Sequence, residues 1–203
     1  MELSEARRRA EPALAIQRRE LAGDDAPNRA LAALRAAPAP TVIGLAAALR
    51  TGDVEERMLA ARLLVDSTLD RDQALAQSRA GLLAESSPEV LRWLATALGH
   101  TRNEDAIADL VALAASEHAP IRFAVAGSLS QCAGGAFDSI ADTLLTLAAD
   151  TDADVRWSAA FELGEWLPVS DDERIRARLL ELADDPAQEV GAVAQRALDG
   201  GSD

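Results

Sequence analysis

Apolar and small residues recur at fixed offsets along most of the chain. Val155 is followed by Ala159, Leu163 and Gly164, which lie four, eight and nine positions further on. Positions four apart advance only about 40° around an α-helix, so these residues form one stripe that can be buried. The same series starts at four other anchor positions, spaced 31 to 35 residues apart: Glu56, Val90, Ile121 and Val190.

The segments between these anchors carry helical stripes of their own. Each anchor helix is therefore preceded by a partner helix and a short turn. One such hairpin cannot bury two stripes alone, whereas stacked hairpins bury them continuously. We expect five hairpins, whose first helices are 41–52, 73–85, 105–116, 138–150 and 172–184.

The second helices also resemble a known family. The segments "DADVRWSAAFELGEW", "PEVLRWLATALG" and "APIRFAVAGSL" resemble HEAT-like repeats, especially the short bacterial type of phycobilisome-lyase-like proteins. The match spans about residues 40–200 and implies an all-α fold: an α-α superhelix (HEAT-like solenoid) of about five helical hairpins. Leu91 and Gly191 depart from the family's arginine position, and Glu56 replaces its first aliphatic anchor.

The front of the chain lacks the repeat. Residues 2–22 and 26–36 have the pattern of two further helices. We therefore predict an N-terminal helical cap over residues 1–38 and a repeat solenoid over residues 39–203. Five arginines in the first segment face nearby glutamates and indicate a solvated helix face, with a nucleic-acid-binding arm as the alternative: Arg7, Arg8, Arg9, Arg18 and Arg19.

Composition agrees with an all-α chain and limits the partners. The apolar share of 49% is largely alanine and leucine, aromatic residues make up 3%, and there is no tyrosine. The formal net charge is −14, which opposes binding to nucleic acid and to anionic membranes. The acids either solvate helix faces, which we prefer, or attract a basic partner.

The location of the protein is predicted from similar features. Cys132 is the single cysteine, and no apolar run approaches the roughly 20 residues that span a bilayer. The first residues have no continuous apolar stretch of the secretory kind. These features favour a cytoplasmic protein, and the absence of lysine beside abundant alanine and arginine favours a GC-rich bacterial genome.

Catalytic and metal-binding patterns do not emerge from the sequence. His100 and His118 are the only histidines, too few for a typical zinc site. A nucleophilic Cys132 would need an activating base and oxyanion donors, which no motif supplies. We predict no catalytic residue, no cofactor and no metal ion.

Arginines follow three of the anchors directly. We interpret Arg57, Arg122 and Arg156 as members of structural ion pairs, with acids three or four residues before the anchors as candidate partners: Asp53, Glu117 and Asp152. The alternative is that these arginines bind an acidic ligand.

The positions two and six after each anchor point away from the buried stripe. They carry Phe123, Trp157 and Phe161 on adjacent repeats and Arg92 on the repeat before, and Trp93, three positions after its anchor, borders them. Aromatic residues and arginine are favoured at interfaces, so we predict a partner-binding site at these five residues. The alternative is that the rings pack between repeats.

The sequence thus predicts a non-catalytic module that binds a protein partner on the concave surface of its second helices. The resemblance leaves two alternatives. One is a bilin (tetrapyrrole) lyase-like subunit that acts with a partner, in which the aromatic residues hold the chromophore. The other is a HEAT-like DNA glycosylase, which the acidic charge disfavours.

Overall fold

The computed structural model describes residues 38–65, 69–132, 137–166 and 172–200, and all regular elements within these ranges are helical. The chain divides into two compact units, residues 1–106 and 107–203. The predicted all-α class is therefore confirmed. The predicted N-terminal cap lies outside the described residues, so its boundary at residue 38 stays a prediction.

The first unit contains two helical hairpins in its described part. Each hairpin packs its two helices together, and the hairpins stack first helix on first helix and second on second. Alanines and leucines fill the core, among them Leu45, Leu59 and Leu94. The helices are α3 (Pro38–Thr51), α4 (Val54–Leu63), α5 (Arg71–Leu82) and α6 (Pro88–His100), followed by the 3₁₀ turn η1 (Glu104–Ala106).

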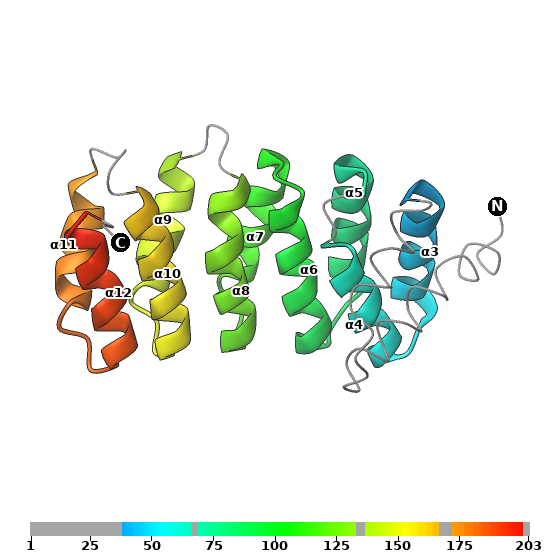
Figure 1. Ribbon diagram of the computed structural model, residues 1–203. Helices are drawn as coiled ribbons and strands as arrows, with labels where there is room; N and C mark the ends of the chain where they lie inside the picture. The colour runs from blue at the N-terminus through cyan, green and yellow to red at the C-terminus, as the bar shows by residue number, and fades with distance from the viewer. Residues whose placement is uncertain (1–37, 66–68, 133–136, 167–171, 201–203) are drawn as a thin grey trace, which may run out of the picture. The chain divides into compact units, whose positions relative to one another are not determined.

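The second unit repeats this arrangement with three hairpins. Its second helices α8, α10 and α12 pack side by side in one layer, and its first helices α7, α9 and α11 form the layer behind them (Figure 1). The helices are α7 (Ile107–Leu113), α8 (Ala119–Leu129), α9 (Phe137–Leu147), α10 (Ala153–Trp166), α11 (Glu173–Leu182) and α12 (Gln188–Leu198), with the 3₁₀ turn η2 (Ser130–Cys132) after α8.

The predicted anchors are buried as the pattern requires. Val90, Ile121, Val155 and Val190 are all at most 1% exposed. The departing anchor Glu56 is only half-buried, because a carboxylate at this position must keep its solvation. The repeat pattern therefore identifies the core stripe correctly.

Four predicted first helices end two or three residues earlier than expected. We predicted helices through residues 85, 116, 150 and 184, and they end at Leu82, Leu113, Leu147 and Leu182. Glu85 and Asp150 therefore lie in the turns between the two helices of their hairpins, as Asp185 does. Hydrophobic periodicity does not show where a helix ends, because the turn residues are polar or small and would also fit in a helix.

One glycine marks the closest approach between α10 and α12. A Cβ atom added to Gly164 would lie 2.7 Å from the Cβ atom of Ala197, closer than any normal contact. The glycine therefore permits the spacing of these two helices. Gly127 on α8 is different, because a Cβ atom there would meet only the Ser158 Oγ atom, at 3.7 Å.

We expect Gly164→Ala to lower the free energy of unfolding by about 1–2 kcal/mol. The steric overlap costs about 1–3 kcal/mol, which exceeds the gain in helix propensity of up to about 1 kcal/mol. The matched change Gly127→Ala should be neutral or stabilising, and Ala197→Gly should rescue Gly164→Ala. Urea denaturation followed by circular dichroism measures all three. Equal effects of the two glycine changes would contradict the close approach.

Candidate functional site

An exposed aromatic surface lies on the second helices of the second unit. Phe123 on α8 is 38% exposed, and Trp157 and Phe161 on α10 are 37% and 42% exposed. All three stand about 200–240° around the helix from their buried anchors, which explains why the core does not cover them. The rings of Trp157 and Phe161 stack, with centroids 5.8 Å apart. The structure therefore places these three predicted residues at the surface.

Small buried residues bring α8 and α10 together beneath this surface. Ser158 is buried, and its hydroxyl donates a hydrogen bond of 3.5 Å to the carbonyl oxygen of Phe123. Gly127 faces the same serine from α8. This contact fixes Phe123 relative to α10, one helix away from Trp157.

A pocket of about 290 Å³ adjoins the aromatic surface between α10 and α12. Phe161 forms one wall, and Val193 and Ala197 supply apolar surface from α12. Glu165 and Arg196 add opposite charges at the same pocket. Gly164, which has no side chain, also lines this pocket where the two helices come close together. The pocket can accept one apolar side chain and leaves charged groups beside it.

A half-buried carboxyl group on α10 belongs to Glu162, the residue after Phe161. Burial raises the pKa of Glu162, a hydrogen bond with the Ser130 hydroxyl lowers it, and the negative charge of Glu165 raises it further. The net result is a raised pKa. Glu162 and Glu165 therefore form a like-charged pair that a positive group would stabilise.

Arg92 and Trp93 belong to the first unit and lie on α6. Trp93 is half-buried and packs against the core of that unit. Its ring has two guanidinium groups nearby, with the Arg92 and Arg62 Cζ atoms 4.6 and 5.2 Å from the ring centroid. These two residues lie in the other unit, so a site shared with the three rings stays a prediction.

The arginines after the anchors form ion pairs with the following repeat. Arg57 binds Glu85, Arg122 binds Asp150 and Arg156 binds Asp185, each through Nε and Nη2 to the two carboxylate oxygens. The separation in sequence is 28 or 29 residues in each case. Two parallel charge-assisted hydrogen bonds fix the guanidinium plane as well as its position.

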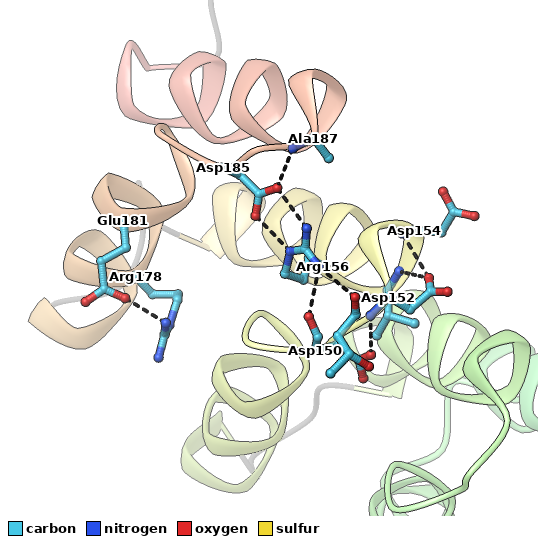
Figure 2. Close-up of polar contacts among 10 residues, drawn as sticks. Asp150, Asp152, Asp154, Arg156, Arg178, Glu181, Asp185 and Ala187 are labelled. Carbon is cyan, nitrogen blue, oxygen red and sulfur yellow. Dashed lines mark hydrogen bonds and ion pairs between the residues drawn. The ribbon is translucent and has the colours of Figure 1, made fainter.

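Each arginine also holds a turn of its own hairpin. Figure 2 shows the arrangement for Arg156, whose Nη1 atom donates to the carbonyl oxygens of Asp150 and Thr151 at 2.9 and 3.2 Å. Asp185 accepts from the amide of Ala187 at 2.8 Å with the same Oδ1 atom that binds Arg156. One side chain thereby joins two consecutive turns.

The structural interpretation of these arginines is thus correct, but the predicted partners are wrong. Asp53 and Asp152 accept amide hydrogen bonds at the starts of their own helices, and Glu117 lies 3.5 Å from the Nε2 atom of His118. Acids three residues before the anchor serve as helix caps. The observed partners lie in the turn of the following hairpin, within hydrogen-bonding distance of the guanidinium group.

The carboxylates of these pairs have shifted pKa values. The hydrogen bond from Arg156 holds the pKa of Asp185 below its ordinary value, and the amide of Ala187 acts in the same direction. Arg122 lowers the pKa of Asp150 in the same way. Both carboxyl groups therefore stay ionised to a lower pH than a free aspartate does.

The cysteine and one histidine considered in the sequence lie in the core or contact the backbone of their own helix. Cys132 is buried at 2% exposure, and the Nδ1 atom of His100 lies 3.0 Å from the Thr96 carbonyl oxygen. Among the described residues, no group of three histidine, cysteine or acidic side chains is placed to hold a metal ion. In the same part of the chain, no helix combines the length and apolar character that crossing a bilayer requires.

Comparison with known proteins defines the class of this fold. Three solved structures illustrate it: an engineered protein (24% identity, TM-score 0.58, covering 97% of this chain and 88% of that one), a designed armadillo repeat protein (18%, 0.60, 97% and 92%) and a designed armadillo repeat protein in complex with peptide (KR)4 (16%, 0.61, 96% and 98%). At these identities the likeness shows the fold alone, that of helical repeat proteins.

Within that class, part of the chain matches a family of known repeats. The family model described as HEAT repeats matches residues 76–164. None of the curated proteins compared with the chain matches it. The finer likeness to phycobilisome-lyase-type repeats stays a prediction.

Sequence reasoning missed the pocket and the acids around the aromatic rings. Asp154 and Glu165 lie on the same helical face as Trp157 and Phe161, at spacings of three and four residues. Helical periodicity therefore contained a signal for these acids. The pocket depends on the approach of two helices at Gly164 and Ala197, which no local pattern reports.

We expect Arg156→Ala to lower the free energy of unfolding by about 1.5–3 kcal/mol, the usual range for hydrogen bonds to charged groups. Asp185, whose side chain is only 6% exposed beside Arg156, would lose its fork partner. Arg156→Lys should recover part of the loss, because lysine keeps the charge but lacks the fork. Arg176→Ala, at an exposed position on α11, is the control for urea denaturation. An effect no larger than that of the control would contradict a structural role.

Stability should also fall in acid as these carboxylates are protonated. Their folded pKa values are lower than in the unfolded chain, so the pairs contribute fully above the unfolded value of about 4. The contribution is lost as the pH falls from about 5 toward the folded pKa. Asp185→Asn should be less stable at pH 7 and show a smaller further loss in acid. Urea midpoints between pH 7 and pH 3 test this, and parallel curves for both proteins would refute it.

Proposed function

We propose that the chain is a non-catalytic protein-binding module, in a bacterial cytoplasm, whose second unit holds a segment of a partner protein on its second helices. The supporting observation is the exposure of Phe123, Trp157 and Phe161 on the adjacent helices α8 and α10. Three large rings that share one face and stay open to water favour an interface.

The rings provide affinity through burial. Covering a large apolar side chain contributes about 1.5–3 kcal/mol before ordering costs are subtracted. Because Trp157 and Phe161 already stack on each other, little side-chain freedom remains to be lost when a partner covers them. The adjoining pocket offers a position for one side chain of the partner.

The comparison supports binding of a peptide segment in general terms. One structural neighbour is a designed armadillo repeat protein in complex with peptide (KR)4. A repeat protein with this fold can thus bind a peptide. The identity of 16% carries over the fold and no contact residue.

Arg92 and Trp93 are proposed as a separate contact in the first unit. The ring of Trp93 is partly open and has two guanidinium groups nearby. An acidic or aromatic side chain of a partner would find both a positive group and a flat apolar surface there.

The test is selection of peptides from a random display library with the whole chain as bait. We expect Trp157→Ala with Phe161→Ala to weaken the selected peptides at least tenfold, which corresponds to about 1.4 kcal/mol. The control is Leu180→Ala, which removes a more exposed apolar side chain from the first helix α11.

Melting temperatures of both variants should stay near that of the parent chain, since the altered side chains are exposed. Failure to enrich any peptide, or binding that survives loss of both rings, would reject this function. Equal weakening by Leu180→Ala would show that the effect is not specific to this face.

A further inference from the structure

The negative charge of this chain is concentrated in the unit that carries the aromatic rings. Residues 107–203 contain 18 acidic residues and 6 arginines, a net charge of −12, whereas residues 1–106 contain 16 acidic residues and 14 arginines, a net charge of −2. A partner of the second unit therefore approaches a strongly negative field.

Acids also stand beside the rings on the same helix. Asp154 lies three residues before Trp157, and Glu165 lies four residues after Phe161, so all four side chains share one exposed face of α10. Figure 2 shows the Asp154 carboxylate turned away from the cluster around Arg156. Within the part of the chain that the structure describes, neither carboxylate takes part in an ion pair, unlike Asp150 and Asp185.

The pair formed by Glu162 and Glu165 supports the same conclusion. Burial of Glu162 and repulsion from Glu165 both disfavour its charged form. A positive side chain beside Glu165 would offset this repulsion and favour the charged form of Glu162. Arg196, on α12 at the same pocket, would repel a positively charged ligand.

We propose that this face binds a basic peptide segment with an apolar side chain, which enters the pocket beside Phe161 while flanking Lys or Arg side chains lie against Asp154 and Glu165. This inference rests on the proposed function and adds the chemistry of the partner. Charge complementarity on α10 selects the basic segment, and the apolar pocket makes a purely polar segment insufficient.

The experiment uses three fluorescently labelled synthetic peptides of twelve residues. The first has a central Leu-Phe pair flanked by lysines, the second has glutamate for every lysine, and the third has Ala-Ala at the centre. Fluorescence anisotropy with the full chain gives the dissociation constants. We expect the first peptide to bind at least tenfold more tightly than either of the others, with weaker binding at higher salt.

Variants of equal net charge separate this face from general attraction to an acidic protein. Asp154→Asn with Glu165→Gln should weaken the first peptide about five- to tenfold. Asp138→Asn with Glu173→Gln removes the same charge from exposed positions on α9 and α11 and should change the affinity less than twofold. Arg196→Gln removes a repelling charge and should leave binding unchanged or tighter.

Equal binding of the basic and acidic peptides, equal weakening by both double variants, or no detectable binding of the first peptide would overturn this inference. So would a stable dimer that Trp157→Asp dissociates, because a second copy would then cover the face. If library-selected peptides still need Trp157 and Phe161 while the charge variants have no effect, the proposed function stands and the basic partner is rejected.

Discussion

Close packing of small residues between consecutive second helices is the constraint on which the rest of each unit depends. Ala126, Ala159 and Ala160 are fully buried where α8 and α10 meet their neighbours, and Gly164 lets α12 come nearer still. Larger side chains at these points would separate the helices and open voids in the core. The approach of the backbones then brings the turns of neighbouring hairpins close enough for an arginine of one to reach an acid of the next.

The ion pairs and the aromatic rings occupy different parts of the second helices. Arg122 and Arg156 lie in the first turn of their helices and join consecutive turns at that end. Their carboxylate partners also accept amide hydrogen bonds, so these charges are already satisfied inside the protein. The next exposed positions along each helix carry the rings, which have no comparable partner. Structural demands are met at the turns, and the middle of the helices remains available for recognition.

The sequence predicted the parts of this fold that repeat and missed those that depend on spacing. Val90, Ile121, Val155 and Val190 were identifiable because burial imposes one periodicity on every hairpin. Asp150 and Asp185 were not identified as arginine partners, because their role depends on where the first helix ends, and periodicity does not fix that end. The exposure of Trp157 and Phe161 was predictable from their rotation around the helix axis, away from the buried anchor. The pocket beside them was not predictable, because it depends on the contact between two helices.

The ion-pair pattern of the repeat has one exception in the sequence. The acid of each ion pair lies five residues before an anchor, and Ser116 occupies that position before Ile121. The arginine position after Val90 is occupied by Leu91, so neither half of the ion pair is present between the second and third hairpins. The boundary between the compact units, at residues 106 and 107, falls between these two positions. Charge changes at the same boundary, from nearly balanced to strongly acidic. The sequence therefore lacks both residues of this ion pair at the point of the repeat register where its charge balance changes.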